Sequence, residues 1–153
     1  MIQRIQSIYL VLAGLFPAFT LFVPIIAFAN ASVVFTMSGV GYENVAQMAE
    51  MQGRHPYGLL FFAVCSIVIS FLSIFAFKNR KKQMKQVKWG VCINVLWYIA
   101  FVVYVLSVKS RTSTDLSFEF GCLFPFFSIL MQILAKHAIK RDEDLVRAAD
   151  RIR

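Results

Sequence analysis

Residues 57–77 read YGLLFFAVCSIVISFLSIFAF, a stretch without a charged side chain. Three further stretches share this apolar character, at residues 5–29, 89–108 and 118–135. A helix that crosses a bilayer needs about 20 mostly apolar residues, because the hydrocarbon core is about 30 Å thick and each residue rises about 1.5 Å. The sequence therefore predicts an all-α membrane protein, a four-transmembrane-helix bundle that forms one domain over residues 1–153.

The overall composition supports a membrane protein. Hydrophobic residues make up 59% of the chain and charged residues only 16%, so a soluble protein of this size would leave apolar surface in water. A soluble helical bundle would also need a polar stripe along each helix. Residues 59–64 and 101–106 are instead apolar on every side, which disfavours that alternative.

The positive charges are unevenly distributed along the chain. The net charge is +8, and of the 16 lysines and arginines one is Arg4, six lie in residues 78–88 and six lie in residues 136–153. Loops on the cytoplasmic side of a membrane protein carry an excess of Lys and Arg. We therefore expect an N-in/C-in topology with a cytoplasmic 78–88 loop, and with loops 30–56 and 109–117 outside.

The first apolar stretch also has features of a secretory signal. Residues 29–31, Ala-Asn-Ala, follow the apolar run and have the small-x-small pattern of a signal-peptidase site. The apolar core of a secretory signal is only about 7–15 residues long, and this run is longer. We expect an uncleaved first helix, kinked or broken near Pro17 and Pro24, because each proline removes an amide donor. Cleavage is the alternative.

The predicted external loops contain strand-like segments. Residues 31–37 are rich in β-branched and aromatic side chains, and Gly39 and Gly41 follow them, which is typical of a strand and a turn. Residues 43–52 are helix-prone. Residues 115–120 alternate polar and apolar side chains, as a half-buried strand does. We expect this segment to pair with residues 33–37 in a small extracytoplasmic cap.

The basic 78–88 loop is assigned to anionic-lipid contact. Each Lys or Arg near a negatively charged leaflet contributes about 1 kcal/mol of attraction. A protein partner is an alternative. Nucleic acid is disfavoured, because no aromatic residues for base stacking are interleaved with the charges before Trp89. The residues assigned to lipid contact are Lys78, Arg80, Lys81, Lys82, Lys85 and Lys88.

Residues 136–153 are predicted to continue the fourth helix into the cytoplasm, because no Gly or Pro interrupts them. Lys140 with Asp144, and Glu143 with Arg147, have the i to i+4 spacing that stabilises a solvated helix. A narrow apolar stripe flanked by charge predicts partner docking, and a solvated tail is the alternative. The residues assigned to docking are Leu145, Ala149, Ile152, Arg147 and Arg151.

The sequence contains no recognisable catalytic, cofactor-binding or metal-binding constellation. Cys65, Cys92 and Cys122 lie in separate predicted spans without a CxxC motif, and we expect them to be buried as small apolar residues. His55 and His137 have no carboxylate or nucleophile at motif spacing. The expected protein is therefore not an enzyme and needs no cofactor, although an enzyme that acts on lipid is an alternative.

Polar residues inside the predicted spans are scarce. Ser66 and Ser70 are four residues apart, which allows another helix to approach closely, and Asn94 is suited to a hydrogen bond across a helix interface. A transporter or channel needs more polar groups at membrane depth to replace the hydration shell of its solute. We therefore assign Ser66, Ser70 and Asn94 to intramembrane packing.

The two ends of the chain resemble those of a known protein family. Residues 1–10, MIQRIQSIYL, and residues 138–153, AIKRDEDLVRAADRIR, resemble the ends of a Bacteroidota family of four-span membrane proteins known as domain of unknown function 4293. The resemblance covers the whole chain in length and in the order of spans. It implies a bacterial inner-membrane location and draws attention to the two cytoplasmic ends. It implies no activity, ligand or catalytic residue.

These observations lead to one functional expectation. The protein is predicted to be a non-catalytic accessory or scaffold subunit of a bacterial inner-membrane assembly, acting through helix packing and the C-terminal docking helix. Its expected partners are anionic membrane lipids and other inner-membrane proteins, and a homo-oligomer is compatible with the same surfaces. A small transport or lipid-handling membrane protein is the alternative.

Overall fold

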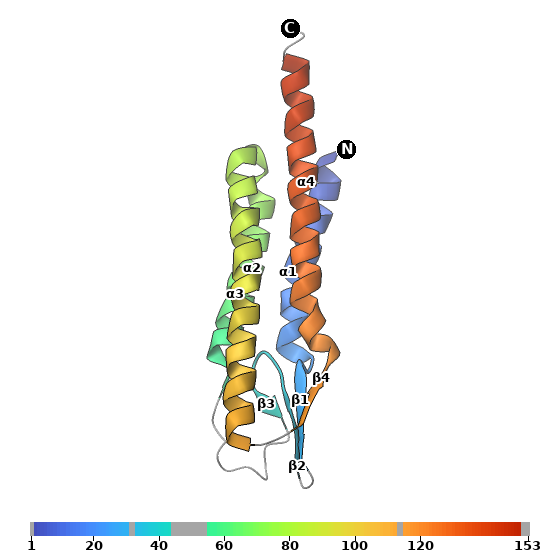
Figure 1. The fold of residues 1–153 in the computed structure, drawn as a ribbon. Coiled ribbons are helices and arrows are strands. Elements are labelled where there is room, and N and C mark those ends of the chain that lie inside the picture. The colour runs from blue at the N-terminus through green and yellow to red at the C-terminus, as the bar shows by residue number, and fades with distance from the viewer. Residues whose placement is uncertain (1, 31–32, 44–54, 113–114, 151–153) are drawn as a thin grey trace.

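A computed structural model describes residues 2–30, 33–43, 55–112 and 115–150. In Figure 1 two helix pairs stand side by side, the first helix beside the last and the second beside the third. Both ends of the chain lie at the same end of this bundle, and the last helix projects beyond the others. The described residues form four long helices, α1 (Ile2–Phe22), α2 (Tyr57–Phe75), α3 (Arg80–Thr112) and α4 (Phe124–Asp150).

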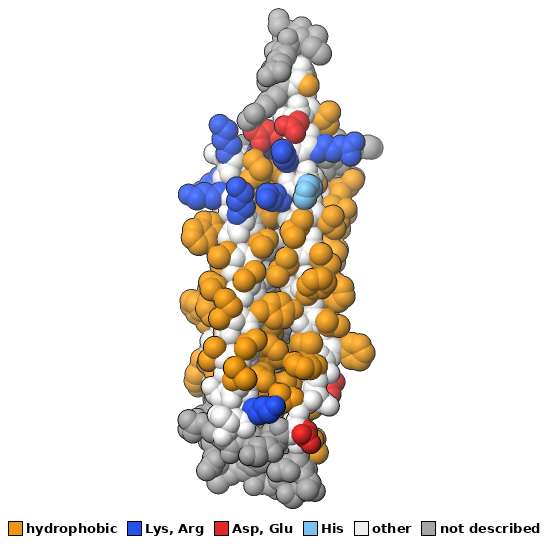
Figure 2. All heavy atoms as spheres, in the orientation of Figure 1, with side chains coloured by type: hydrophobic (Ala, Val, Ile, Leu, Met, Phe, Trp, Pro, Cys, Tyr) orange, Lys and Arg blue, Asp and Glu red, His pale blue; other side chains and the backbone are white. Residues whose placement is uncertain are grey.

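Each of these four helices is long enough and apolar enough to cross a membrane. At most 33% of each candidate span is buried inside the protein, so most of its apolar side chains lie on the outer surface. Figure 2 shows these side chains as a broad apolar belt across the middle of the face in view. Such a belt requires lipid as its solvent. The fold is therefore that of a multi-pass membrane protein.

A small antiparallel sheet lies at the end of the bundle opposite the termini (Figure 1). Its strand order is β3-β2-β1-β4, so β1 is hydrogen-bonded on both sides. Phe28 of β1 is opposite Phe35 of β2 and Leu116 of β4. The strands within the described residues are β1 (Ile26–Asn30), β2 (Val33–Met37), β3 (Tyr42–Glu43) and β4 (Asp115–Phe118).

The first span differs from the prediction of a helix over residues 5–29. Helix α1 ends at Phe22, where Val23 donates the last helical hydrogen bond to the Phe19 carbonyl at 3.0 Å. Pro24 has no amide to donate, and it disfavours helical geometry in the residue before it. The chain then turns into β1. Pro17 lies inside α1 without ending it.

The sheet also corrects the predicted pairing of residues 33–37 with residues 115–120. These segments contain β2 and β4, but β1 lies between them and pairs with both. The all-α prediction missed β1 because residues 26–29 are all apolar and show none of the alternation of a half-buried strand. The helix-prone segment 43–52 falls almost wholly outside the described residues.

The predicted 78–88 loop is mostly helix. A short 3-10 turn, η2 (Ala76–Lys78), connects α2 to α3, which already begins at Arg80. The Asn79 side chain caps α3, since its Oδ1 accepts a hydrogen bond from the Lys82 amide at 3.1 Å. The 33 residues of α3 extend roughly 50 Å, well beyond the hydrocarbon core of about 30 Å.

The fourth span begins later than the predicted residue 118. The chain passes from β4 into a 3-10 turn, η3 (Phe120–Leu123), and α4 starts at Phe124. Helix α4 then continues without a break to Asp150. The predicted continuation of the fourth helix beyond residue 136 is therefore present as far as the structure describes it.

Two apolar clusters hold the elements together. The larger one joins the sheet to α2 and α3, and includes the stacked pairs Phe28–Phe35 and Trp97–Phe101, with ring centroids 4.9 and 5.5 Å apart. The smaller cluster lies toward the termini and joins helices α1, α3 and α4. Its buried residues are Leu10, Val87, Ala135 and Ile139.

Candidate functional site

A chain of buried polar side chains crosses the middle of the bundle. Ser66 Oγ of α2 donates to Asn94 Oδ1 of α3 at 3.2 Å, and Asn94 Nδ2 donates to Ser128 Oγ of α4 at 3.3 Å. Ser128 Oγ then donates to the Ala13 carbonyl of α1 at 2.7 Å. All four helices are thereby connected at a depth where unpaired polar groups are costly. The structure thus brings Ser66 and Asn94 into direct contact.

Ser70 belongs to a separate buried polar contact, between α2 and α4. Gln132 Nε2 of α4 donates to Ser70 Oγ at 3.4 Å, and both side chains are buried. A Cβ on Gly90 would lie 2.8 Å from Gln132 Nε2, so a side chain at this position would displace the Gln132 amide group. Sequence reasoning did not single out Gly90, since a close approach between distant segments leaves no local signal. The arrangement fits helix packing.

Five of the six basic residues assigned to lipid contact lie on the first turns of α3. Lys81, Lys82, Lys85 and Lys88 are exposed. Figure 2 shows blue side chains gathered in a band at the end of the apolar belt where the termini lie. We call this end of the bundle the charged end. Lys78 lies in η2, and its side chain is outside the description.

Arg80 differs from the other basic residues because it faces the interior of the charged end. Its Nη1 lies 2.7 Å from Asp142 Oδ2 of α4, and the two side chains are 27% and 14% exposed. Gln6 of α1 also contacts α4 here, donating from Nε2 to the Ala138 carbonyl at 3.2 Å. These contacts join α1, α3 and α4 beyond the apolar belt. No sequence pattern indicated the pairing of Arg80 with Asp142.

Of the residues assigned to docking, Leu145 lies on the part of α4 that projects past the other helices (Figure 1). Leu145 is 51% exposed and the adjacent Val146 is 46% exposed. Helix α4 extends eight residues past Asp142 to Asp150, or about 12 Å. The sequence prediction did not include Val146. The side chains of Arg147 and Ala149, and all of Arg151 and Ile152, lie outside the description.

The three cysteines are free and lie apart. Cys65 and Cys122 are half-buried, but Cys92 is exposed on α3, so the expectation that all three are buried is wrong for Cys92. An apolar thiol on the outer surface of a span is compatible with lipid. Among the described residues, no three His, Cys, Asp or Glu side chains gather in a way that could hold a metal ion.

A family model described as Domain of unknown function (DUF4293) matches residues 2–152. The chain belongs to this family. The matched range includes both segments on which the resemblance of the sequence rests, residues 1–10 and 138–153, except for the first and the last residue of the chain. The description of the DUF4293 family names no activity and no ligand. A search of curated proteins finds no match. The function must therefore be inferred from the geometry described above.

Proposed function

We propose that this protein is a non-catalytic accessory or scaffold subunit of a bacterial inner-membrane assembly. It docks a partner protein on the projecting part of α4. The observation that carries the proposal is the exposure of Leu145 and Val146 on a helix segment that no other described element covers. Two adjacent large apolar side chains outside the apolar belt cost free energy in water, and a partner surface would bury them.

The closed interior of the bundle supports a role in packing rather than in transport. Ser66, Asn94 and Ser128 use their polar atoms to bind one another and the α1 backbone. A solute pathway would need such groups to be available to the solute. Anionic lipid headgroups would contact the exposed lysines of α3, which form part of the charged end (Figure 2).

We further propose that the charged end lies in the cytoplasm and the sheet lies outside as a small cap. The positive-inside rule supports this orientation, because the basic turns of α3 and α4 share one end of the bundle (Figure 2). Within such a topology, the projecting part of α4 would meet cytoplasmic domains of neighbouring inner-membrane proteins.

Single-cysteine labelling tests the orientation. In a chain without Cys65, Cys92 and Cys122, cysteines placed at the exposed positions Lys82 and Ala148 are expected to be protected from a membrane-impermeant maleimide in intact cells. A cysteine at Val40, which is 47% exposed near the sheet, is expected to react. Permeabilised cells provide the control for reactivity at all three positions. If the cysteine at position 82 reacts in intact cells and the cysteine at position 40 does not, the orientation is opposite to the one proposed.

A charge on the projecting apolar surface tests the docking role. We expect Leu145→Glu to lower recovery of the co-purifying partner at native expression by at least about tenfold, because burying an unpaired carboxylate in an interface costs several kcal/mol. The matched control is Lys140→Gln, which changes the net charge equally at an exposed position about 140° away around the helix.

The yield and thermal stability of both variants should equal those of the wild type, since neither side chain is buried. Unchanged partner recovery with Leu145→Glu contradicts the docking role. An equal loss with Lys140→Gln would point to general electrostatic attraction instead of a specific contact.

A further inference from the structure

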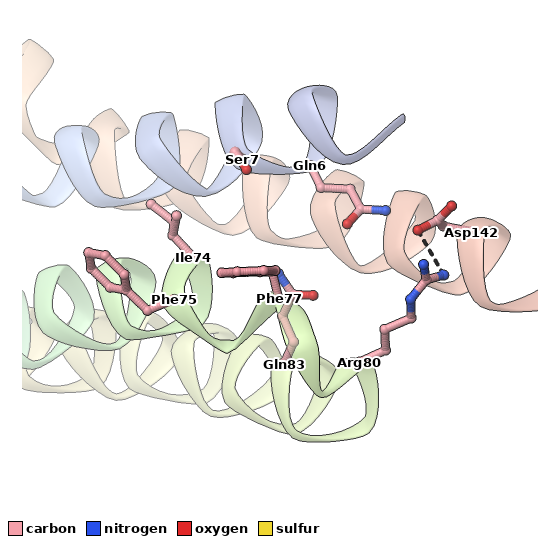
Figure 3. A pocket seen from close by; sticks show the side chains of 8 residues that line it. All are labelled: Gln6, Ser7, Ile74, Phe75, Phe77, Arg80, Gln83 and Asp142. Carbon is pink, nitrogen blue, oxygen red and sulfur yellow. Dashed lines mark ion pairs between the residues drawn. The ribbon is translucent and has the colours of Figure 1, made fainter. Parts of the chain in front are cut away.

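A pocket of about 260 Å³ opens at the charged end, between α1, the α2–α3 turn and α4. Figure 3 shows its polar side chains on one side and three apolar side chains on the other. The apolar side belongs to the end of α2 and to η2. The lining residues are Gln6, Ser7, Ile74, Phe75, Phe77, Arg80, Gln83 and Asp142.

Among the described residues that line the pocket, Arg80 is the cationic donor on the polar side. Arg80 Nη1 is buried and close to Asp142 Oδ2, but the approach is not aligned for a hydrogen bond, so this nitrogen has no hydrogen-bond partner among the described residues. The ion pair with Asp142 offsets part of the cost of burying this charge, and the guanidinium has further N–H donors that a ligand could use. The guanidinium is also the group best shaped to bind the oxygens of a phosphate.

The same side of the pocket offers several acceptors. The amide nitrogens of Gln6 and Gln83 already donate to the carbonyls of Ala138 and Ser73. Within the described residues neither amide oxygen accepts a hydrogen bond, although both side chains are more than nine-tenths buried. With the Asp142 carboxylate, these oxygens form an acceptor set that suits a primary ammonium, which has three N–H donors and no acceptor.

The apolar side leads toward the membrane. Phe75 is 75% exposed and Phe77 is 53% exposed, and Ile74 lies between them and α1 in Figure 3. These side chains lie where the apolar belt meets the charged end, at the depth of lipid headgroups. A molecule with its polar part at Arg80 would therefore extend its apolar part over α2.

We propose that this pocket binds the headgroup of phosphatidylethanolamine. The phosphate would contact the Arg80 guanidinium, and the ammonium would contact the Asp142 carboxylate and the two glutamine oxygens. The volume of about 260 Å³ suits a headgroup whose acyl chains remain outside, since pockets for whole drug-sized ligands start at about 300 Å³. This site does not depend on the docking role of α4.

The charge pattern of the pocket favours this lipid over others. Phosphatidylglycerol has the phosphate but no cation, so it would leave the Asp142 carboxylate facing a phosphate. Phosphatidylcholine has a cation, but its trimethylated nitrogen has no N–H to donate. The exposed lysines of α3, in contrast, would attract any anionic lipid without discrimination.

Lipid titration of the full chain tests the proposal. The protein, delipidated in detergent, is titrated separately with the ethanolamine, choline and glycerol lipids of identical acyl chains, and native mass spectrometry measures the fraction with one bound lipid. Because charge-assisted hydrogen bonds are lost with the other headgroups, we expect the ethanolamine lipid to bind at least about tenfold more tightly. Equal binding of the choline lipid overturns the proposal. Tighter binding of the glycerol lipid also overturns the proposal, because attraction to the exposed lysines would then explain the binding.

Two variants assign the contacts within the pocket. Asp142→Asn is expected to lower the affinity for the ethanolamine lipid at least about fivefold and to leave the affinity for the choline lipid unchanged. Arg80→Gln should lower the affinity for every phospholipid that enters the pocket. The matched controls Asp144→Asn and Lys140→Gln alter exposed positions of α4 outside the pocket and should bind as the wild type does. Equal effects in variants and controls contradict the site. If a pocket variant does not fold, the headgroup selectivity of the wild-type chain still tests the proposed site.

Discussion

Gly121→Ala is expected to lower the free energy of unfolding by about 3 kcal/mol, at the upper end of the range for overpacked sites. A Cβ on Gly121 would lie 2.3 Å from the Pro24 carbonyl oxygen and 2.8 Å from the Pro24 carbonyl carbon. These are backbone atoms, so no side-chain rotation relieves the clash. The Gly121 amide also donates to the Pro24 carbonyl at 3.0 Å, and separating the segments would break this bond.

The measurement is reversible unfolding in mixed detergent micelles, followed by circular dichroism. Gly14→Ala is the matched control, because its Cβ would lie 3.3 Å from Ser70 Cβ, a tight contact that a shift of a few tenths of an ångström relieves. We expect the control to change stability by less than about 1 kcal/mol, since alanine also favours the helix that it joins. Equal stabilities of the two variants would mean that the connection between β1 and η3 is not as close as described.

Trp97→Ala is expected to destabilise the protein by about 3–5 kcal/mol. Trp97 is 1% exposed, stacks on Phe101 with ring centroids 5.5 Å apart, and meets Tyr98 edge to face. It belongs to the cluster that joins the sheet to α2 and α3. Removing the indole would leave a cavity at this junction, and the loss of van der Waals contacts would not be offset by lipid.

Trp97→Phe serves as the control for this second prediction. The indole Nε1 is buried and has no hydrogen-bond partner among the described residues, so phenylalanine loses part of the volume but no hydrogen bond. Its expected cost is about 1 kcal/mol, as for other conservative core replacements. A cost as large as that of alanine would indicate that the indole N–H has an essential partner. Unfolding in mixed micelles measures both variants.

The spans were predictable because lipid imposes a length and an apolar composition that can be read locally. Their ends were not. Residues 26–30 are as apolar as the helix before them, and only the pairing of β1 with two strands makes them a central strand. The basic residues after Asn79 were interpreted as a loop because of their charge. Lys, Arg, Gln and Met are good helix formers, however, and α3 simply extends beyond the membrane.

In the candidate sites, too, the role of a single residue could be predicted from the sequence around it, but its contacts with other helices could not. Asn94 could be recognised as a packing residue because a lone amide in an apolar span has few other roles. Its hydrogen bond to Ser128 could not be predicted, because it depends on how α3 and α4 pack, and no local spacing in the sequence indicates that packing. Arg80 and Asp142 each looked like one of many surface charges. Only the contact between α3 and α4 sets this pair apart and places it in a pocket.

Site-specific photo-crosslinking tests the docking role of α4 most directly. A photoreactive phenylalanine analogue is placed at Leu145 in the full chain at native expression, and a matched chain has it at Lys140. We expect one discrete adduct of defined mass from position 145 and none from position 140, because Leu145 belongs to the proposed docking surface and Lys140 does not. Absence of any adduct at 145, or the same mixture of adducts at both positions, would contradict a docking role for the projecting part of α4.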